Sequence, residues 1–380
     1  MTTSLDTESI ITSNALQIKV QKEDLLKSIT TVFGAISSKA TLPILNNILI
    51  QTKGPDQIAL TGTDLELGIK TYCSATVLLQ GAVTVPAKKL YEIVRELGVG
   101  EIEITVGKNN AVNIKANKSF FKIVGLEPDD FPKLPEPQAE QSFEIDRQVL
   151  RRCFSLTVFA ISRDETRYTL NGALVIFKNK KARFVATDGK RLACAEKEIQ
   201  GGKDISFEVI IPTKTILEVA KTIADSQGKM KVVLAQNQII FQIDETTLIS
   251  RLIEGKFPNY EQVIPKETKT KTEVDRQEFL ACMKRVLVFT SQENQAVKID
   301  FIGDKLLISS RSPSGEAKEE LPAKIIGEDL TIGFNPTYII DVLKNLDEDK
   351  ISLAMTDPDK PGLIQSGEDY LYVVMPMQLS

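Results

Sequence analysis

The 380-residue sequence contains no histidine and no tryptophan. Without histidine, a Ser–His–Asp or Cys–His nucleophilic site cannot form, and neither can a metal site that needs imidazole. The four cysteines are scattered without CxxC spacing, and Cys153 and Cys282 fall within expected helices. Reduced, buried thiols are therefore expected, as in a cytosolic protein. Several common classes of enzyme are excluded by these absences alone.

Long apolar runs are also missing, since no stretch approaches the ~18–20 residues that span a bilayer. Residues 1–14 are polar and contain no lysine or arginine, so they fit neither a secretory signal nor a transit peptide. We expect no membrane partner and a cytoplasmic location. The net charge of −4 argues against a generally basic nucleic-acid binder, so any DNA contact needs a local basic surface.

A strand-then-helix phrase occurs three times along the chain. In its clearest copy, alternating residues from Phe143 give way to helical spacing at Leu150, Phe154 and Val158. The same phrase surrounds Val20 earlier in the chain and Val274 later. A repeat this long is no solenoid of small units, because those recur every ~20–50 residues.

A second phrase recurs in the same order and supports the repeat. Strands ending at Pro86 and Pro212 precede amphipathic helices, and proline is tolerated at a helix start. In the third copy we expect Asn335 as the N-cap and Pro336 as the first helical residue. We predict three domains of one α+β fold at 16–139, 140–268 and 269–380, after a flexible N-terminal extension at 1–15.

Candidate metal ligands are few. Asp64 and Glu66 are expected on one strand face, where a polar face next to a turn is the favoured interpretation. The run from Asp357 to Glu368 resembles a calcium loop, but Pro361 replaces an oxygen ligand and the flanks read as strands. We predict neither metal nor cofactor. A metal-dependent nuclease using Asp64, Glu66, Asp357 and Asp359 is the alternative, although these residues belong to different copies.

Two further stretches stand out. The turn at 186–192 is expected to expose two cations, Lys190 and Arg191. The apolar run at 370–379 should not be fully exposed to solvent, because large exposed apolar patches are rare. We expect it to be either a buried final strand or part of a groove.

Several stretches together resemble the bacterial DNA polymerase III β subunit family, the sliding clamps. They are Thr41–Leu45, Thr61–Glu66, Leu170–Gly172, Ala186–Ala193, Phe257–Tyr260 and Tyr372–Met377. The resemblance runs over nearly the whole chain from Leu16. It implies three DNA-clamp domains, each with two inner helices and outer antiparallel sheets. Two chains would close head-to-tail into a six-domain homodimeric ring around duplex DNA.

The resemblance implies a non-catalytic processivity factor that slides on DNA without sequence specificity. Its partners would be double-stranded DNA, the DNA polymerase III α subunit, the clamp loader, and other replication and repair proteins that carry clamp-binding peptides. Besides the nuclease, a three-domain scaffold that does not encircle DNA remains open.

The resemblance also implies site residues. Loop residues Lys39, Arg163 and Arg167 would face DNA, and Lys39 stands where the family often has arginine. The repeated helices add cations, among them Arg147, Arg151, Lys214 and Arg276. At the dimer interface, Phe121 would face Val288 and Phe289 of the partner chain. The partner-peptide groove would comprise Leu170, Thr187, Gly189, Lys190, Arg191, Leu192, Pro258, Val263, Tyr338, Val373, Val374, Met375, Pro376 and Met377, with Gln262 and Gln378 where relatives commonly have arginine.

Overall fold

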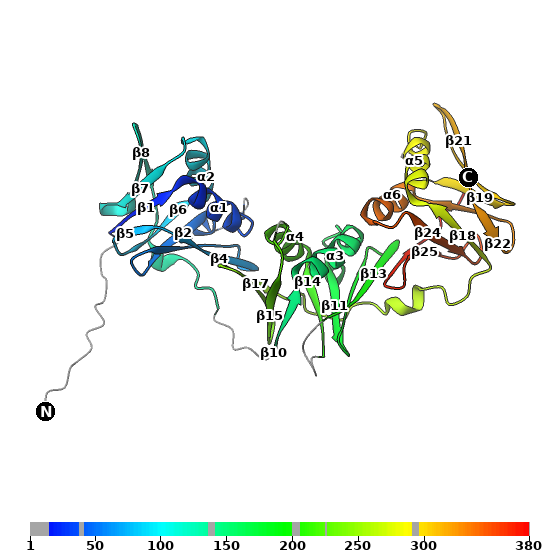
Figure 1. The fold of residues 1–380 in the computed structure, drawn as a ribbon, viewed down its shortest axis with the longest axis horizontal. Coiled ribbons are helices and arrows are strands. Elements are labelled where there is room, and N and C mark those ends of the chain that lie inside the picture. The colour runs from blue at the N-terminus through cyan, green and yellow to red at the C-terminus, as the bar shows by residue number, and fades with distance from the viewer. Residues whose placement is uncertain are drawn as a thin grey trace. The chain divides into compact units, whose positions relative to one another are not determined.

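The structure is a computed structural model that describes residues 15–37, 42–135, 141–199, 206–224, 226–290 and 296–379. Its helices pack in pairs, α1 with α2, α3 with α4 and α5 with α6 (Figure 1). Their bounds are α1 (Lys22–Phe33), α2 (Ala87–Glu96), α3 (Arg147–Thr157), α4 (Thr213–Thr222), α5 (Arg276–Leu287) and α6 (Pro336–Asn345).

A strand leads directly into each helix, which confirms the repeated strand-then-helix phrases. These strands are β1 (Leu16–Gln21), β6 (Ala82–Pro86), β10 (Gln141–Asp146), β14 (Phe207–Pro212), β18 (Thr270–Asp275) and β23 (Leu330–Phe334). The predicted cap is also confirmed, because the Asn335 side chain accepts a hydrogen bond from the Thr337 N–H and Pro336 opens α6.

The same backbone tie holds the first helix of each repeat. The N–H of Lys22 donates to the Gly100 carbonyl at 3.0 Å, that of Arg147 to Gly228 at 3.0 Å, and that of Arg276 to Asp349 at 2.8 Å. In the second and third copies the guanidinium bonds nearby carbonyls as well. Arg147 and Arg276 are therefore buried, and the expectation that they add cations to the helix surface is wrong.

The described chain falls into two compact units. The first consists of the described residues within Met1–Ser142 and Met230–Arg251. Its five-stranded antiparallel sheet has the order β5-β1-β7-β8-β9, with β5 (Thr76–Leu79), β7 (Glu101–Val106), β8 (Ala111–Ala116) and β9 (Ser119–Val124). Its second sheet runs β15-β16-β17-β4-β3-β2-β6, with β15 (Lys229–Ala235), β16 (Gln238–Ile243), β17 (Thr246–Arg251), β4 (Leu67–Ser74), β3 (Gln57–Thr63) and β2 (Asn47–Lys53).

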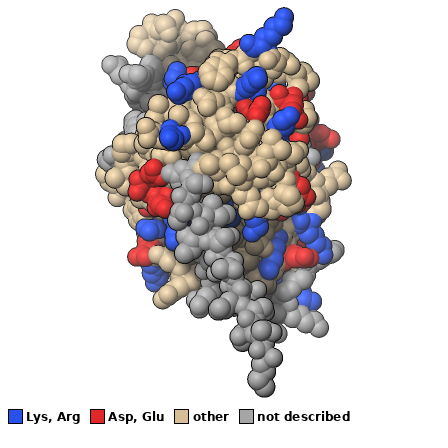
Figure 2. All heavy atoms as spheres, turned by 90° about the vertical axis from the view of Figure 1, so that its left-hand side faces the viewer, with Lys and Arg blue, Asp and Glu red and all other residues tan. Residues whose placement is uncertain are grey.

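The surface of the molecule mixes both signs of charge on the face that Figure 2 draws. Lysine and arginine side chains are interspersed there with aspartate and glutamate around an area with few charges. The coloured, described side chains on this face thus alternate between the two signs of charge.

The second unit consists of Phe143–Lys229 and Leu252–Ser380. Its nine-stranded sheet has the order β14-β11-β12-β13-β26-β25-β24-β18-β22, with β11 (Gly172–Lys178), β12 (Lys181–Thr187), β13 (Arg191–Glu198), β26 (Tyr370–Val374), β25 (Gly362–Ser366), β24 (Lys350–Met355) and β22 (Lys324–Ile326). A four-stranded sheet runs β21-β20-β19-β23, with β21 (Gly315–Pro322), β20 (Lys305–Ser312) and β19 (Val297–Ile302). The C-terminal apolar run is thus a buried strand up to Val374, after which Met375 is exposed.

Strand pairing extends beyond each sequence repeat. β17 pairs with β4, and β13 pairs with β26, so a strand of one copy continues the sheet of another. The boundaries at 139/140 and the extension at residues 1–14 lie outside the described residues, and all the domain boundaries stay predictions.

Candidate functional site

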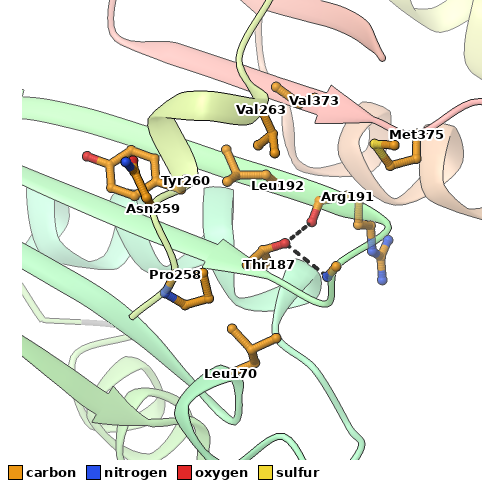
Figure 3. Close-up of a pocket in the computed structure, with 11 residues that line it drawn as sticks. Leu170, Thr187, Arg191, Leu192, Pro258, Asn259, Tyr260, Val263, Val373 and Met375 are labelled. Carbon is orange, nitrogen blue, oxygen red and sulfur yellow. Dashed lines mark hydrogen bonds between the residues drawn. The ribbon is translucent and has the colours of Figure 1, made fainter. Parts of the chain in front are cut away.

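A cavity of about 140 Å³ lies in the second unit, beside the turn between β12 and β13 and the end of β26 (Figure 3). Its walls come from four segments that are distant in sequence. The lining residues are Leu170, Thr187, Gly189, Arg191, Leu192, Pro258, Asn259, Tyr260, Val263, Val373 and Met375.

The β12–β13 turn is fixed by its own side chains. The Thr187 hydroxyl donates to the Arg191 carbonyl at 2.6 Å and accepts from the Gly189 N–H at 3.0 Å, as Figure 3 shows. The Asp188 carboxylate accepts from the N–H groups of Lys190 and Arg191. Gly189 has φ +85°, which glycine adopts without the steric cost of a side chain.

Arg191 is held rigidly in the pocket wall. Its guanidinium bonds Asp341 Oδ2 at 2.7 Å, Asp188 Oδ2 at 3.1 Å and the Phe159 carbonyl at 2.7 Å. It also stacks 4.5 Å from the centroid of the Tyr338 ring. Only 10% of its side chain is exposed. The expectation of two exposed cations is therefore wrong for Arg191, whereas Lys190 is exposed.

The pocket floor is apolar and its rim is partly open. Leu170, Leu192 and Val373 belong to one buried hydrophobic cluster. At the rim, Val263 is 43% exposed and Met375 is 40% exposed. Two carboxylates already neutralise Arg191, the charged residue of the wall. An exposed apolar patch with polar neighbours is typical of an interaction site.

Most of the predicted groove residues line this cavity. Lys190, Tyr338, Val374, Pro376 and Met377 do not, but they lie close in the structure. Tyr338 stacks on Arg191, and the Lys190 carbonyl accepts from the Met375 N–H at 2.9 Å. Sequence reasoning left Asn259 and Tyr260 out of the groove, although both belong to the Phe257–Tyr260 stretch that it singled out.

The candidate DNA-contacting residues occupy a loop and two packed helices. Arg163 and Arg167 are exposed on one loop, where Arg167 pairs with Asp164 at 3.6 Å and donates to the Asp188 carbonyl. Arg151 is exposed on α3, and Lys214 lies half-buried on α4, which packs against α3. Lys39 lies outside the described residues.

The candidate dimer residues lie on two separate elements. Phe121 is 37% exposed on β9, the edge strand of the five-stranded sheet. Val288 follows α5 and is 73% exposed, while Phe289 is half-buried. Both Phe121 and Val288 therefore expose apolar side-chain surface.

The proposed metal ligands do not form a site in the described residues. Asp64 and Glu66 lie in the turn between β3 and β4, so their expected place on a strand face is wrong. Asp64 accepts from the N–H groups of Glu66 and Leu67, which uses its carboxylate to shape the turn. Asp357 pairs with Lys269 at 2.7 Å between two strands. No group of three or more His, Cys, Asp or Glu in the described ranges is placed to hold a metal ion.

None of the helices in the described ranges is both long and apolar enough to cross a membrane. The fold and the pocket define a class of protein: repeated α+β domains that share antiparallel sheets and carry an apolar pocket.

Comparison with known proteins identifies the family. Three family models match in order: the N-terminal domain of the DNA polymerase III β subunit at residues 16–135, the central domain at 144–259, and the C-terminal domain at 261–378. The β sliding clamp of Chlamydia pneumoniae is 33% identical over 96% of this chain and 99% of its own length. That of Pseudomonas aeruginosa is 34% identical over 96% of this chain and 100% of its own.

Solved structures of sliding clamps have the same fold as this chain. The crystal structure of the Bacillus subtilis sliding clamp has a TM-score of 0.92 at 30% identity, covering 96% of this chain and 100% of that one. A P. aeruginosa sliding clamp bound to griselimycin has a TM-score of 0.91 at 33% identity, with the same coverage. The chain belongs to the DNA polymerase III β subunit family, the β sliding clamps. It is a non-catalytic processivity factor of three clamp domains.

Proposed function

We propose that the pocket of the second unit is the docking groove for short peptide segments of the DNA polymerase III α subunit, the clamp loader, and other replication and repair proteins. The observation that carries this proposal is the apolar cavity with its half-open rim at Val263 and Met375. The P. aeruginosa clamp that binds griselimycin supports a ligand-binding surface on this fold.

The chemistry of the pocket selects an apolar ligand. Leu170, Leu192 and Val373 supply branched surfaces, and Met375 adds an adaptable thioether at the rim. Because Arg191 is neutralised by Asp188 and Asp341, a charged anchor gains little there. An extended peptide with apolar anchors and a glutamine fits these walls. A few desolvated anchors would supply most of the affinity.

The experiment measures fluorescence polarisation of a labelled peptide from the tail of the α subunit. Deleting Met375 to Ser380 should abolish binding, and Met375→Asp should weaken it by about tenfold or more, since a charge would enter the apolar rim. Leu379→Asp is the matched control, because Leu379 is 42% exposed on the same tail but does not line the cavity. Unchanged binding by Met375→Asp and the truncated chain would refute the groove.

We further propose that two chains form a head-to-tail ring around duplex DNA in the cytoplasm. The cations Arg163, Arg167, Arg151 and Lys214, together with Lys39, would meet the phosphates. Phosphate contacts position a protein without reading sequence, which suits a sliding ring. Unlike ends on a chain of three like domains favour head-to-tail closure.

A non-encircling scaffold is the alternative to this ring. Retention of the protein on circular DNA, followed by release when the DNA is linearised, distinguishes the two. A scaffold would dissociate equally from both forms.

A further inference from the structure

The first unit contains a second cavity, of about 120 Å³, at the turn between β3 and β4. Three kinds of segment form its walls, as in the pocket of the second unit. They are a turn, the end of the strand that pairs with the strand after that turn, and a connecting segment. Its lining residues are Thr63, Leu65, Glu66, Gly68, Pro132, Lys133, Leu134, Pro135, Gln238, Ile249 and Arg251.

The two turns have the same backbone architecture. Thr63 accepts from the Leu65 N–H at 3.0 Å, as Thr187 accepts from Gly189 at 3.0 Å. The Asp64 carboxylate accepts from the N–H groups two and three residues further along the chain, and the Asp188 carboxylate does the same. Leu65 has φ +78°, close to the +85° of Gly189. Each Asp–x–x turn therefore presents the same frame to its cavity.

The neighbouring strands also correspond. The Arg251 N–H donates to the Glu66 carbonyl at 2.9 Å, and the Met375 N–H donates to the Lys190 carbonyl at 2.9 Å. A Phe-Pro pair precedes both connecting segments, at Phe131–Pro132 and Phe257–Pro258. Arg251 thus occupies the place of Met375, and Leu134 occupies the place of Tyr260.

The side chains at the floor differ between the two cavities. Gly68 pairs with Thr63 in the sheet, as Leu192 pairs with Thr187, so Gly68 stands where the second unit has a leucine. Cδ2 of Leu134 occupies the space in which a Cβ on Gly68 would lie. In the second unit, Tyr260 instead reaches Arg183, whose Nη1 donates to its hydroxyl at 3.1 Å.

The rims differ in charge as well. Glu66, Lys133 and Arg251 line the first cavity, and both Glu66 and Arg251 are exposed. The counterpart of Glu66 beside the second cavity is Lys190, also charged, whereas those of Lys133 and Arg251 are the uncharged Asn259 and Met375. An apolar peptide anchor would have to desolvate these charges, which costs free energy unless they are paired.

We infer that the repeat builds two equivalent docking frames, each made of a turn, a neighbouring strand end and a connecting segment. In the first frame, Leu134 packs on Gly68 behind a charged rim and keeps partner peptides out. Leu134 is thereby a specificity-determining residue that leaves each chain with one peptide site. This inference rests on the proposed function of the second pocket. It adds that the first frame is blocked by the chain's own side chain.

The test uses the full-length chain carrying Met375→Asp, so that the second pocket no longer contributes. In this background, Leu134→Ala removes the side chain that blocks the first cavity. Arg251→Met gives its rim a methionine, as Met375 does at the second pocket. The matched control replaces Leu134→Ala by Leu126→Ala, since Leu126 is exposed on the same connecting segment and does not line the cavity. Polarisation of the labelled α-subunit peptide is the readout, with thermal melting to verify folding.

The wild-type chain should bind about one peptide, and the Met375→Asp chain should lose at least about tenfold in affinity, as for a hot-spot anchor. The opened chain should regain saturable binding, and the Leu126 control should not. If the wild-type chain does not bind at all, both the groove and this inference fall. If the wild type binds but the folded, opened chain regains nothing, Leu134 is not the barrier and the inference alone falls. The Met375→Asp chain could also retain some binding that is lost when Arg251→Glu is added. That result would show that the first cavity already binds peptide, and it would overturn the inference as well.

Discussion

At the scale of single residues, Arg191 shows how burial changes the role of a cation. Three oxygen acceptors and the face of Tyr338 surround its guanidinium, so the side chain links the β12–β13 turn to α6. Arginine suits this place because its planar fork donates in several directions while stacking on a ring.

We expect Arg191→Lys to lower the free energy of unfolding by about 1–3 kcal/mol, because lysine keeps the charge but loses the fork and the stack. Urea unfolding followed by circular dichroism measures this change. Lys190→Ala is the control, since this exposed neighbour should change stability by less than about 0.5 kcal/mol. Equal effects of the two substitutions would show that the contacts of Arg191 add nothing.

The carboxyl group of Glu196 makes the free energy of unfolding depend on pH in the acidic range. Burial raises the pKa of this carboxyl, but hydrogen bonds from Lys181 and Arg183 at 2.7 and 2.8 Å outweigh it, so the pKa lies below its usual range. A lowered carboxyl pKa stabilises the folded state above the unfolded pKa, and this contribution is lost as the pH falls through the folded pKa.

The unfolding free energies of wild type and Glu196→Gln should therefore differ by a constant amount above about pH 5 and converge as the pH falls below about 4.3, the ordinary glutamate pKa. Urea unfolding at a series of pH values measures the difference, with Glu198→Gln as the exposed control. A difference that stays constant down to about pH 2, well below that ordinary pKa, would contradict the assignment of the lowered pKa.

At the scale of elements, the edge strand β9 is unusual. Phe120 is 63% exposed and Val124 is 69% exposed, so this apolar strand shows much of its side-chain surface. An open, apolar sheet edge invites pairing with another chain.

We predict that Phe121→Asp raises the dimer dissociation constant by about tenfold or more, because an unpaired charge would be buried. Val288→Asp should act in the same direction if it faces Phe121 in the partner chain. Analytical ultracentrifugation at low micromolar concentration measures the change. Leu79→Asp is the matched control, since Leu79 is 48% exposed on β5, the opposite edge of the same sheet. A Phe121→Asp chain that remains as dimeric as the control would place the interface elsewhere.

At the scale of the whole molecule, an acidic chain that holds DNA must do so through local cations. Arg163 and Arg167 share one exposed loop, and Arg151 extends from α3. Several helix cations are engaged within the chain, since Arg147 and Arg276 are buried and Arg285 pairs with Glu319 at 2.7 Å. Fewer exposed cations are therefore available for the proposed DNA contact than composition suggests.

Replacing Arg163 and Arg167 by alanine should weaken DNA binding about equally for all sequences and reduce the salt slope by roughly 0.9 for each phosphate that is no longer neutralised. Fluorescence anisotropy with duplexes of different sequence, measured across salt concentrations, tests this expectation. Lys178→Ala with Lys180→Ala removes the same charge from the β11–β12 turn and is the control. An unchanged salt slope in the arginine variant, or a marked sequence preference in the wild type, would exclude this loop as the phosphate-binding surface.

From the sequence alone one can predict the repeated strand-then-helix units, the Asn335 cap, and the buried thiols of Cys153 and Cys282. These features depend on side-chain periodicity and capping within a few residues, so local chemistry suffices to predict them. The enclosure of Arg191 is visible only in the folded chain, as are the role of Asp64 in shaping a turn and the pairing of β17 with β4. The folded chain also shows how a nearby side chain, that of Leu134, fills the space above Gly68 in the sheet. Each of these outcomes depends on which distant strand supplies the neighbour and which way one side chain turns, and such long-range packing leaves no local pattern in the chain.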